Sequence, residues 1–145
     1  RNTDLVKESG LSVQKYSEQE IEEVLGQIKE LVSQNKFIIS TGENRVKNDE
    51  FADEFNLDKE KRKQLILKIE VRDFCDCVQS LNVYKNHDDY FIFGPCFLLT
   101  DVFGDERQVQ VYAKFVLATS KTTGLKTIVV SFHEAERPMS YYFKK

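Results

Sequence analysis

The clearest periodic pattern in the chain lies between residues 21 and 32, where apolar residues recur at the spacing of one helix face. Just before it, Ser17 to Glu20 reads SEQE, the form of a capping box in which each side chain bonds an unpaired amide of the first turn. The pattern therefore predicts a helix that begins after Ser17. Its apolar positions are Ile21, Val24, Leu25, Ile28, Leu31 and Val32.

Two further helices are predicted in the first half of the chain. Phe51 and Phe55, four residues apart, indicate a short helix over residues 48–55. Asp58 is a suitable N-cap for another helix, whose highly charged first turns lead into an apolar end near residue 69.

Strand patterns are found before and after these helices. The apolar run at residues 37–39 is typical of a short strand, and the turn-forming sequence TGEN ends it. Beyond residue 71 the pattern changes to strands, with candidates at residues 73–78 and 90–99. A polar loop is expected over residues 82–89.

The stretch from residue 108 to 138, QVQVYAKFVLATSKTTGLKTIVVSFHEAERP, predicts two strands around a turn. Val111, Ala113 and Phe115 alternate with polar residues on the first strand. A one-residue slip of register would turn every side chain over, so the hydrophobic pattern selects the pairing. We expect Ile128, Val130 and Phe132 of the second strand to share the core side with them. The opposite face then carries Gln110, Tyr112, Lys114, Ser131 and His133.

Helices followed by strands make an α+β domain, with the helices expected to pack on one face of an antiparallel sheet. Residues 1–16 are polar and have no clear period, which is typical of an arm. Residues 17–145 are long enough to form a single domain with its own core.

Composition narrows the classes of function. The formal net charge of -3 does not indicate a strong electrostatic binder of nucleic acid. No apolar run approaches the roughly 20 residues that span a bilayer, and the N-terminus has no apolar secretory core. No membrane association is therefore expected, and the cytoplasm is the expected compartment. Three cysteines, an odd number, argue against a disulfide framework.

The polar face of the hairpin carries the candidate chemistry. His133 can transfer protons near neutral pH, although a strand-end histidine can equally pack or bond the backbone. Lys114 can neutralise a phosphate and Tyr112 can stack on a base or donate a proton, but both are also common on solvent-facing strands. No metal site is expected, because His133 lacks the second histidine of the His-Glu-x-x-His motif. Cys75 and Cys77 also lack the usual zinc-ligand spacing.

The order of elements resembles that of the motility quorum-sensing regulator (MqsR) toxins, which belong to the RelE-like superfamily. The resemblance covers roughly residues 20–137. It includes the opening IKELVSQNKFIIS, a later LxLxIxxxDF, then VYxKF and a closing IVVSFHEAE. Its strongest pieces are the strings VYAK at residues 111–114 and VVSF at residues 129–132.

This resemblance implies a RelE-like fold and a small toxin that cleaves messenger RNA without metal or cofactor. A cognate antitoxin protein would hold it inactive. The family's important tyrosine falls on Tyr112, while its lysine after the last SF falls on His133. Another family lysine corresponds to Asp76, and the family's glutamine has no clear counterpart within residues 90–94.

Metal-free RNA cleavage needs a base for the 2′-hydroxyl, a cation for the developing charge and an acid for the departing 5′-oxygen. His133, Lys114 and Tyr112 are the candidate catalytic residues for these roles, and His133 and Tyr112 can exchange acid and base duties. The expected substrate-binding residues are Gln110, Ser131 and Arg137.

Two other classes of function remain open. A non-enzymatic protein-interaction module on the same fold is favoured by Asp76, by the missing glutamine and by the acidic composition. A cysteine or metal hydrolase would use the cysteines with His87 or His133, but nothing in the sequence places these residues together.

Overall fold

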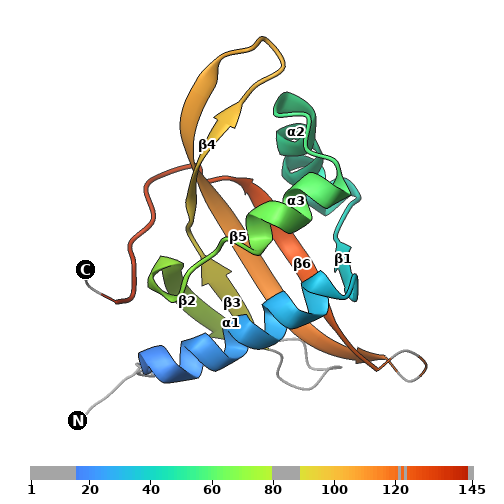
Figure 1. Cartoon of the computed structure of the whole chain (residues 1–145), viewed down its shortest axis with the longest axis vertical. Helices are drawn as coiled ribbons and strands as arrows, with labels where there is room; N and C mark the ends of the chain where they lie inside the picture. The colour runs from blue at the N-terminus through green and yellow to red at the C-terminus, as the bar shows by residue number, and fades with distance from the viewer. Residues whose placement is uncertain (1–15, 80–88, 121, 123, 144–145) are drawn as a thin grey trace.

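The computed structural model describes residues 16–79, 89–120, 122 and 124–143. This part of the chain forms three α-helices and one six-stranded sheet, which confirms the α+β class (Figure 1). All of the predicted arm at residues 1–16 except Tyr16, and most of the predicted loop at 82–89, lie outside the described residues. The helices are α1 (Glu18–Ser33), α2 (Val46–Glu54) and α3 (Lys59–Ile66). The strands are β1 (Phe37–Ile39), β2 (Phe74–Gln79), β3 (Asp89–Phe93), β4 (Cys96–Thr100), β5 (Glu106–Ser120) and β6 (Gly124–Glu134).

Side-chain caps define the beginnings of α1 and α3. The Ser17 hydroxyl accepts from the Glu20 amide at 3.1 Å, and the Glu20 carboxylate accepts from the Ser17 amide at 2.9 Å, so the capping box is confirmed. Asp58 caps α3 by accepting from the Lys61 amide at 2.8 Å. α3 ends at Ile66, three residues before the predicted end.

The sheet has the strand order β1-β6-β5-β3-β2, with β4 paired to β5 outside this path. Its pairs are antiparallel except for β1, which runs parallel to β6, so the sheet is mixed rather than wholly antiparallel. No hairpin joins β1 to β6, and their relative direction was therefore not fixed by local sequence. The strand predicted over 90–99 divides at Gly94 and Pro95 into β3 and β4, because proline cannot donate to the ladder.

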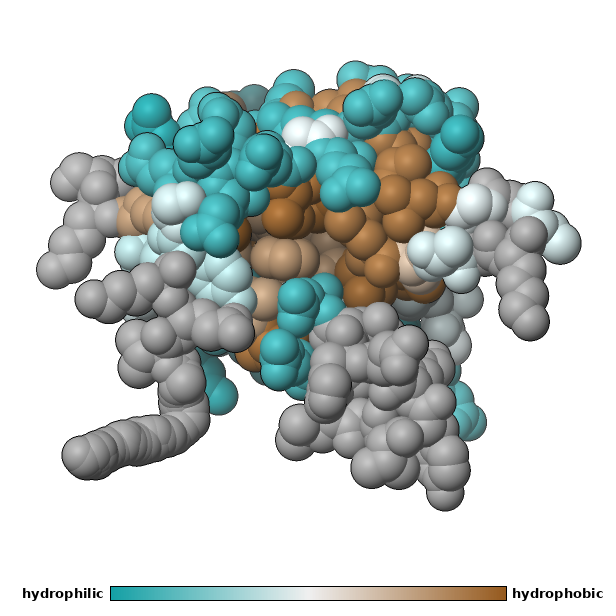
Figure 2. All heavy atoms as spheres, turned by 90° about the horizontal axis from the view of Figure 1, so that it is seen from below, coloured by the Kyte–Doolittle hydropathy of each residue, from teal (hydrophilic) through white to brown (hydrophobic). Residues whose placement is uncertain are grey.

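One apolar core joins the helices to the sheet. Figure 1 shows α1 and α3 crossing in front of the sheet, and a single cluster of buried side chains includes residues of all three helices. Viewed from below, apolar side chains gather in the middle of the molecule beside a hydrophilic rim (Figure 2). The fully buried members from β3, β5 and β6 are Phe93, Val109, Val111, Ala113, Phe115, Val129 and Phe132.

A bulge in β6 changes the predicted register over half of the strand. Lys114 pairs with Ser131 but Phe115 pairs with Val129, so Val130 is the extra residue. An added residue reverses which side chains face the core. Phe132 faces the core as predicted, whereas the prediction for Ile128 is wrong, and Val130 is buried as predicted but lines a cavity on the open face. Val129 and Thr127 occupy the core side in their place, and both are fully buried.

The side chain of Asn48 joins α2 to β6 just beyond the end of β1. The Ser40 amide makes the last β1-type bond, to the Val129 carbonyl at 2.9 Å. The Asn48 amide group then accepts from the Phe132 amide at 2.8 Å and donates to the Val130 carbonyl at 3.1 Å. It also donates to the Ser40 carbonyl at 3.1 Å. The side-chain amide of Asn48 therefore takes the place, beside β6, that the next backbone peptide group of β1 would occupy.

The two ends of the described chain meet at Phe74. The Tyr142 amide donates to the Phe74 carbonyl at 2.9 Å, and the Tyr16 amide donates to the Tyr142 hydroxyl oxygen at 2.7 Å. The Tyr16 ring packs edge-on against both Phe74 and Tyr142. The C-terminal segment is thus bound to the sheet at β2.

Replacing Asn48 by alanine is expected to lower the free energy of unfolding by about 2–4 kcal/mol, because two buried backbone groups of β6 lose their partner. Urea denaturation measures this change. Asp49→Ala, at the exposed neighbouring position of α2, is the control and should change stability little. Equal effects of the two substitutions would contradict the role of Asn48.

The bulge also predicts a stabilising substitution. The Thr127 hydroxyl is buried and has no hydrogen-bond partner among the described residues. Thr127→Val replaces it by a methyl group of similar shape and is expected to raise the free energy of unfolding by about 1 kcal/mol. The same denaturation experiment tests it. A loss of stability would instead indicate that this hydroxyl is hydrogen-bonded.

Candidate functional site

Cross-strand pairing brings the polar residues of the hairpin together. Tyr112 pairs with His133, and Lys114 pairs with Ser131 at the next position. The Tyr112 and His133 rings are stacked, with centroids 5.4 Å apart and an angle of 20° between their planes. Directly opposed residues of antiparallel strands lie within side-chain contact, so the register alone places a phenol beside an imidazole.

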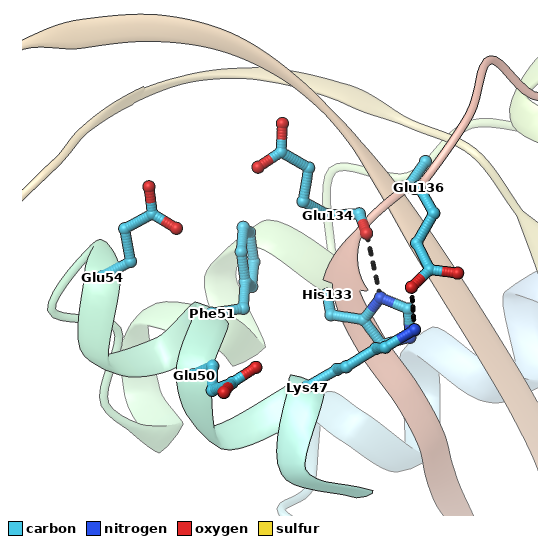
Figure 3. A pocket seen from close by; sticks show the side chains of 8 residues that line it. Lys47, Glu50, Phe51, Glu54, His133, Glu134 and Glu136 are labelled. Atoms are coloured by element: carbon cyan, nitrogen blue, oxygen red, sulfur yellow. Dashed lines mark hydrogen bonds and ion pairs between the residues drawn. The ribbon is translucent and has the colours of Figure 1, made fainter.

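A backbone contact defines the protonation pattern of the neutral His133 ring. Its Nδ1 lies 3.0 Å from the Glu134 carbonyl oxygen (Figure 3). A carbonyl oxygen can only accept, so Nδ1 carries the proton and donates to it. The lone pair of the neutral ring is therefore on Nε2. That nitrogen is the one able to take a proton from a substrate.

Tyr112 is half-buried and is favoured in its protonated form. Burial, and after it the negative charge of Asp76, raises the pKa of Tyr112 above that of ordinary tyrosine, although the charge of Arg45 opposes the shift. A phenol with a raised pKa remains a proton donor throughout the neutral range.

Lys114 supplies a partly desolvated cation. Its ammonium nitrogen lies 5.0 Å from the centre of the Tyr90 ring, at cation–π distance. Burial, and after it the charge of Arg45, lowers the pKa of Lys114. An ammonium group with a lowered pKa is a stronger hydrogen-bond donor to an anionic oxygen.

Arg45 and Lys47 join the site from outside the hairpin, and sequence reasoning missed both. Arg45 ends the 3-10 turn Glu43–Arg45 and Lys47 lies in the first turn of α2. Both line one cavity together with Ser131 and His133. No periodic pattern marks these residues, because only the attachment of α2 to β6 brings them close to the hairpin.

The predicted substrate-binding residues have different environments. The Gln110 side chain donates to the Tyr141 hydroxyl oxygen at 2.9 Å and accepts from the Met139 amide at 3.0 Å, so it holds the C-terminal segment. Arg137 is exposed and lines a cavity of about 390 Å³ together with Tyr112 and His133.

Carboxylates surround the opposite side of His133. Figure 3 shows Glu50, Glu54, Glu134 and Glu136 around a cavity that His133 also lines. Lys47 forms an ion pair with Glu136. Arg107 bonds the carboxylates of both Glu54, at 2.9 Å, and Glu134, at 3.2 Å. The site therefore has a cationic side, formed by Lys114 and Arg45, and an anionic side, formed by these glutamates.

Among the described residues, no cysteine lines the cavities that His133 lines. Burial raises the pKa of the Cys75 thiol to about 11, so the nucleophilic thiolate is disfavoured near neutral pH. His87 lies outside the described residues. Within the described ranges, no three His, Cys, Asp or Glu side chains form a group able to hold a metal ion. No helix in the described part of the chain has the length and apolar character to span a membrane.

Comparisons with known proteins identify no relative of this chain: no family model, curated protein or solved structure matches it. The geometry of the site is therefore the main basis for inferring its function.

The effect of Asp76 on Tyr112 gives a test of the site's electrostatics. Asp76→Asn is expected to lower the pKa of Tyr112, because the phenolate would no longer face a carboxylate. Alkaline titration of tyrosinate absorbance measures it, as the difference between each protein and its Tyr112→Phe counterpart. Glu106→Gln, six residues from Tyr112 along β5, is the control and should cause no shift. A pKa unchanged by Asp76→Asn would show that the carboxylate does not act on Tyr112.

Proposed function

We propose that this protein is an endoribonuclease toxin with a RelE-like fold, whose helices pack on one face of the sheet. It cleaves RNA without a metal ion in the cytoplasm, and a cognate antitoxin protein restrains it. The stacked pair of Tyr112 and His133, with Lys114 and Arg45 on one side, is the observation that carries this proposal.

The pair provides an acid and a base at one phosphate. His133 Nε2 takes the proton of the ribose 2′-hydroxyl, and the 2′-oxygen forms a bond to phosphorus. Tyr112 donates its proton to the 5′-oxygen as the bond from phosphorus to that oxygen breaks. The products are a 2′,3′-cyclic phosphate and a free 5′-hydroxyl group.

The cations complete this chemistry. Lys114 and Arg45 stabilise the negative charge that develops on the phosphorane oxygens. Ser131 pairs with Lys114 on the neighbouring strand and can orient the phosphate. Arg137 binds the RNA backbone from the exposed end of the cavity. Asp76 favours protonated Tyr112, which agrees with a role of the phenol as the acid.

Substitution of the acid and the base tests this mechanism. Purified His133→Ala and Tyr112→Phe proteins should each cleave RNA on the order of 10²–10⁴-fold more slowly. Glu106→Gln, on a distant part of β5, should cleave as wild type does. Gel analysis of a labelled RNA measures the rates. Cleavage should persist in EDTA and fail on an RNA with 2′-deoxyribose.

If wild-type protein leaves the RNA intact, the endoribonuclease is refuted and the protein-interaction module is favoured.

The surface at the β4–β5 hairpin favours a protein partner in either case. Phe103 is 87% exposed there, and Leu98 and Val102 are also exposed. Large apolar side chains grouped on a surface are typical of interaction sites.

A further inference from the structure

A further cavity lies beside the Tyr112–His133 pair and has an apolar floor. Val116, Ile128 and Val130 form this floor, where Val116 pairs with Ile128 across the two strands. The cavity has a volume of about 400 Å³, within the usual range of small-molecule sites. The bulge at Val130 directs Ile128 and Val130 away from the core and so creates this floor.

Polar and aromatic groups line the same cavity. Tyr90 and Lys114 form one wall, where the ammonium group lies over the ring at 5.0 Å. Ser40 and Arg45 line it as well. An apolar floor, an aromatic ring and two cations are the groups that bind single-stranded nucleic acid, because bases stack while the cations contact the backbone.

This cavity adjoins the proposed catalytic residues and shares a lining residue with them. Arg45 lines both this cavity and the one that contains Ser131 and His133. Val130 and Ser131 are consecutive in β6, and Ser131 pairs with Lys114 of the cavity wall. A phosphate beside Lys114 would therefore place a neighbouring base close to the apolar floor.

We propose that this cavity binds one nucleobase of a single-stranded RNA, from the nucleotide next to the scissile phosphate. The inference rests on the proposed endoribonuclease function and adds a subsite for the substrate's base. The base lies on Val116, Ile128 and Val130 with Tyr90 beside it, and Lys114 and Arg45 hold the adjoining phosphate. Double-stranded RNA is excluded as the preferred substrate, since its bases are paired and stacked.

Binding of a non-cleavable oligonucleotide tests the subsite apart from catalysis. The probes are 2′-O-methyl RNA hexamers of each base, together with an abasic hexamer of the same backbone. Fluorescence anisotropy should show that Tyr90→Ala weakens binding of the hexamer that wild type binds best by about tenfold. Binding of the abasic hexamer should not change.

Matched variants separate stacking from folding. Tyr90→Phe retains the ring and should bind as wild type does. Ile128→Glu places a charge on the half-exposed floor and should weaken binding of the base-containing hexamer more than that of the abasic one. Thermal unfolding of each variant confirms that the weakened proteins are folded. If the folded Tyr90→Ala and Ile128→Glu proteins both bind as wild type does, the subsite is refuted.

The subsite and the cleavage reaction can fail independently. His133→Ala should keep the preference for base-containing over abasic hexamers while losing cleavage of unmodified RNA. Base-dependent binding without any cleavage by wild type would support the subsite and refute the endoribonuclease. Cleavage by wild type with equal affinity for abasic and base-containing hexamers would support the enzyme and refute the subsite.

Discussion

The contact of Asn48 with β6 is the constraint on which the site depends. A side-chain amide presents one donor and one acceptor in the same plane as a peptide group does, so it can continue a ladder after a strand has ended. β1 ends at Ile39, and Asn48 extends its edge by one position. The beginning of α2 is thereby fixed against β6, and Arg45 and Lys47 lie beside Ser131 and His133. Without this contact the hairpin would present a phenol and an imidazole beside Lys114 but lack Arg45 as a second cation.

The bulge at Val130 divides β6 into two parts that place different kinds of side chain on the open face of the sheet. Beyond it, the alternation puts Ser131 and His133 on the open face, where polar chemistry is possible. Before it, the same face receives Ile128, an apolar residue that a regular strand would have placed in the core. The cost is the burial of the Thr127 hydroxyl on the other side. A single inserted residue thus puts an apolar surface directly beside a charged one.

Much of the fold follows from local sequence. The capping box of α1 and the cap of α3 are decided by residues within one turn, and the sequence predicted both starts. That Tyr112 and His133 share one face was also predictable, because the alternation on β5 and the apolar Phe132 on β6 define the faces, whereas their direct pairing is shown by the structure. The bulge was not predictable, since TIVVSF is equally compatible with unbroken alternation. The parallel direction of β1 and the position of Arg45 depend on contacts between distant segments, which no local pattern records.

The order of strands has a consequence for synthesis of the protein. β1 is the first strand of the described chain, yet its partner β6 follows about 90 residues later, from Phe37 to Thr127. Contacts of such long sequence separation form only after the intervening chain is available. On the ribosome the apolar face of α1 and the future site on β5 therefore remain incomplete until β6 has emerged. A nascent chain therefore brings the phenol of Tyr112 beside the imidazole of His133 only after β6 has been synthesised.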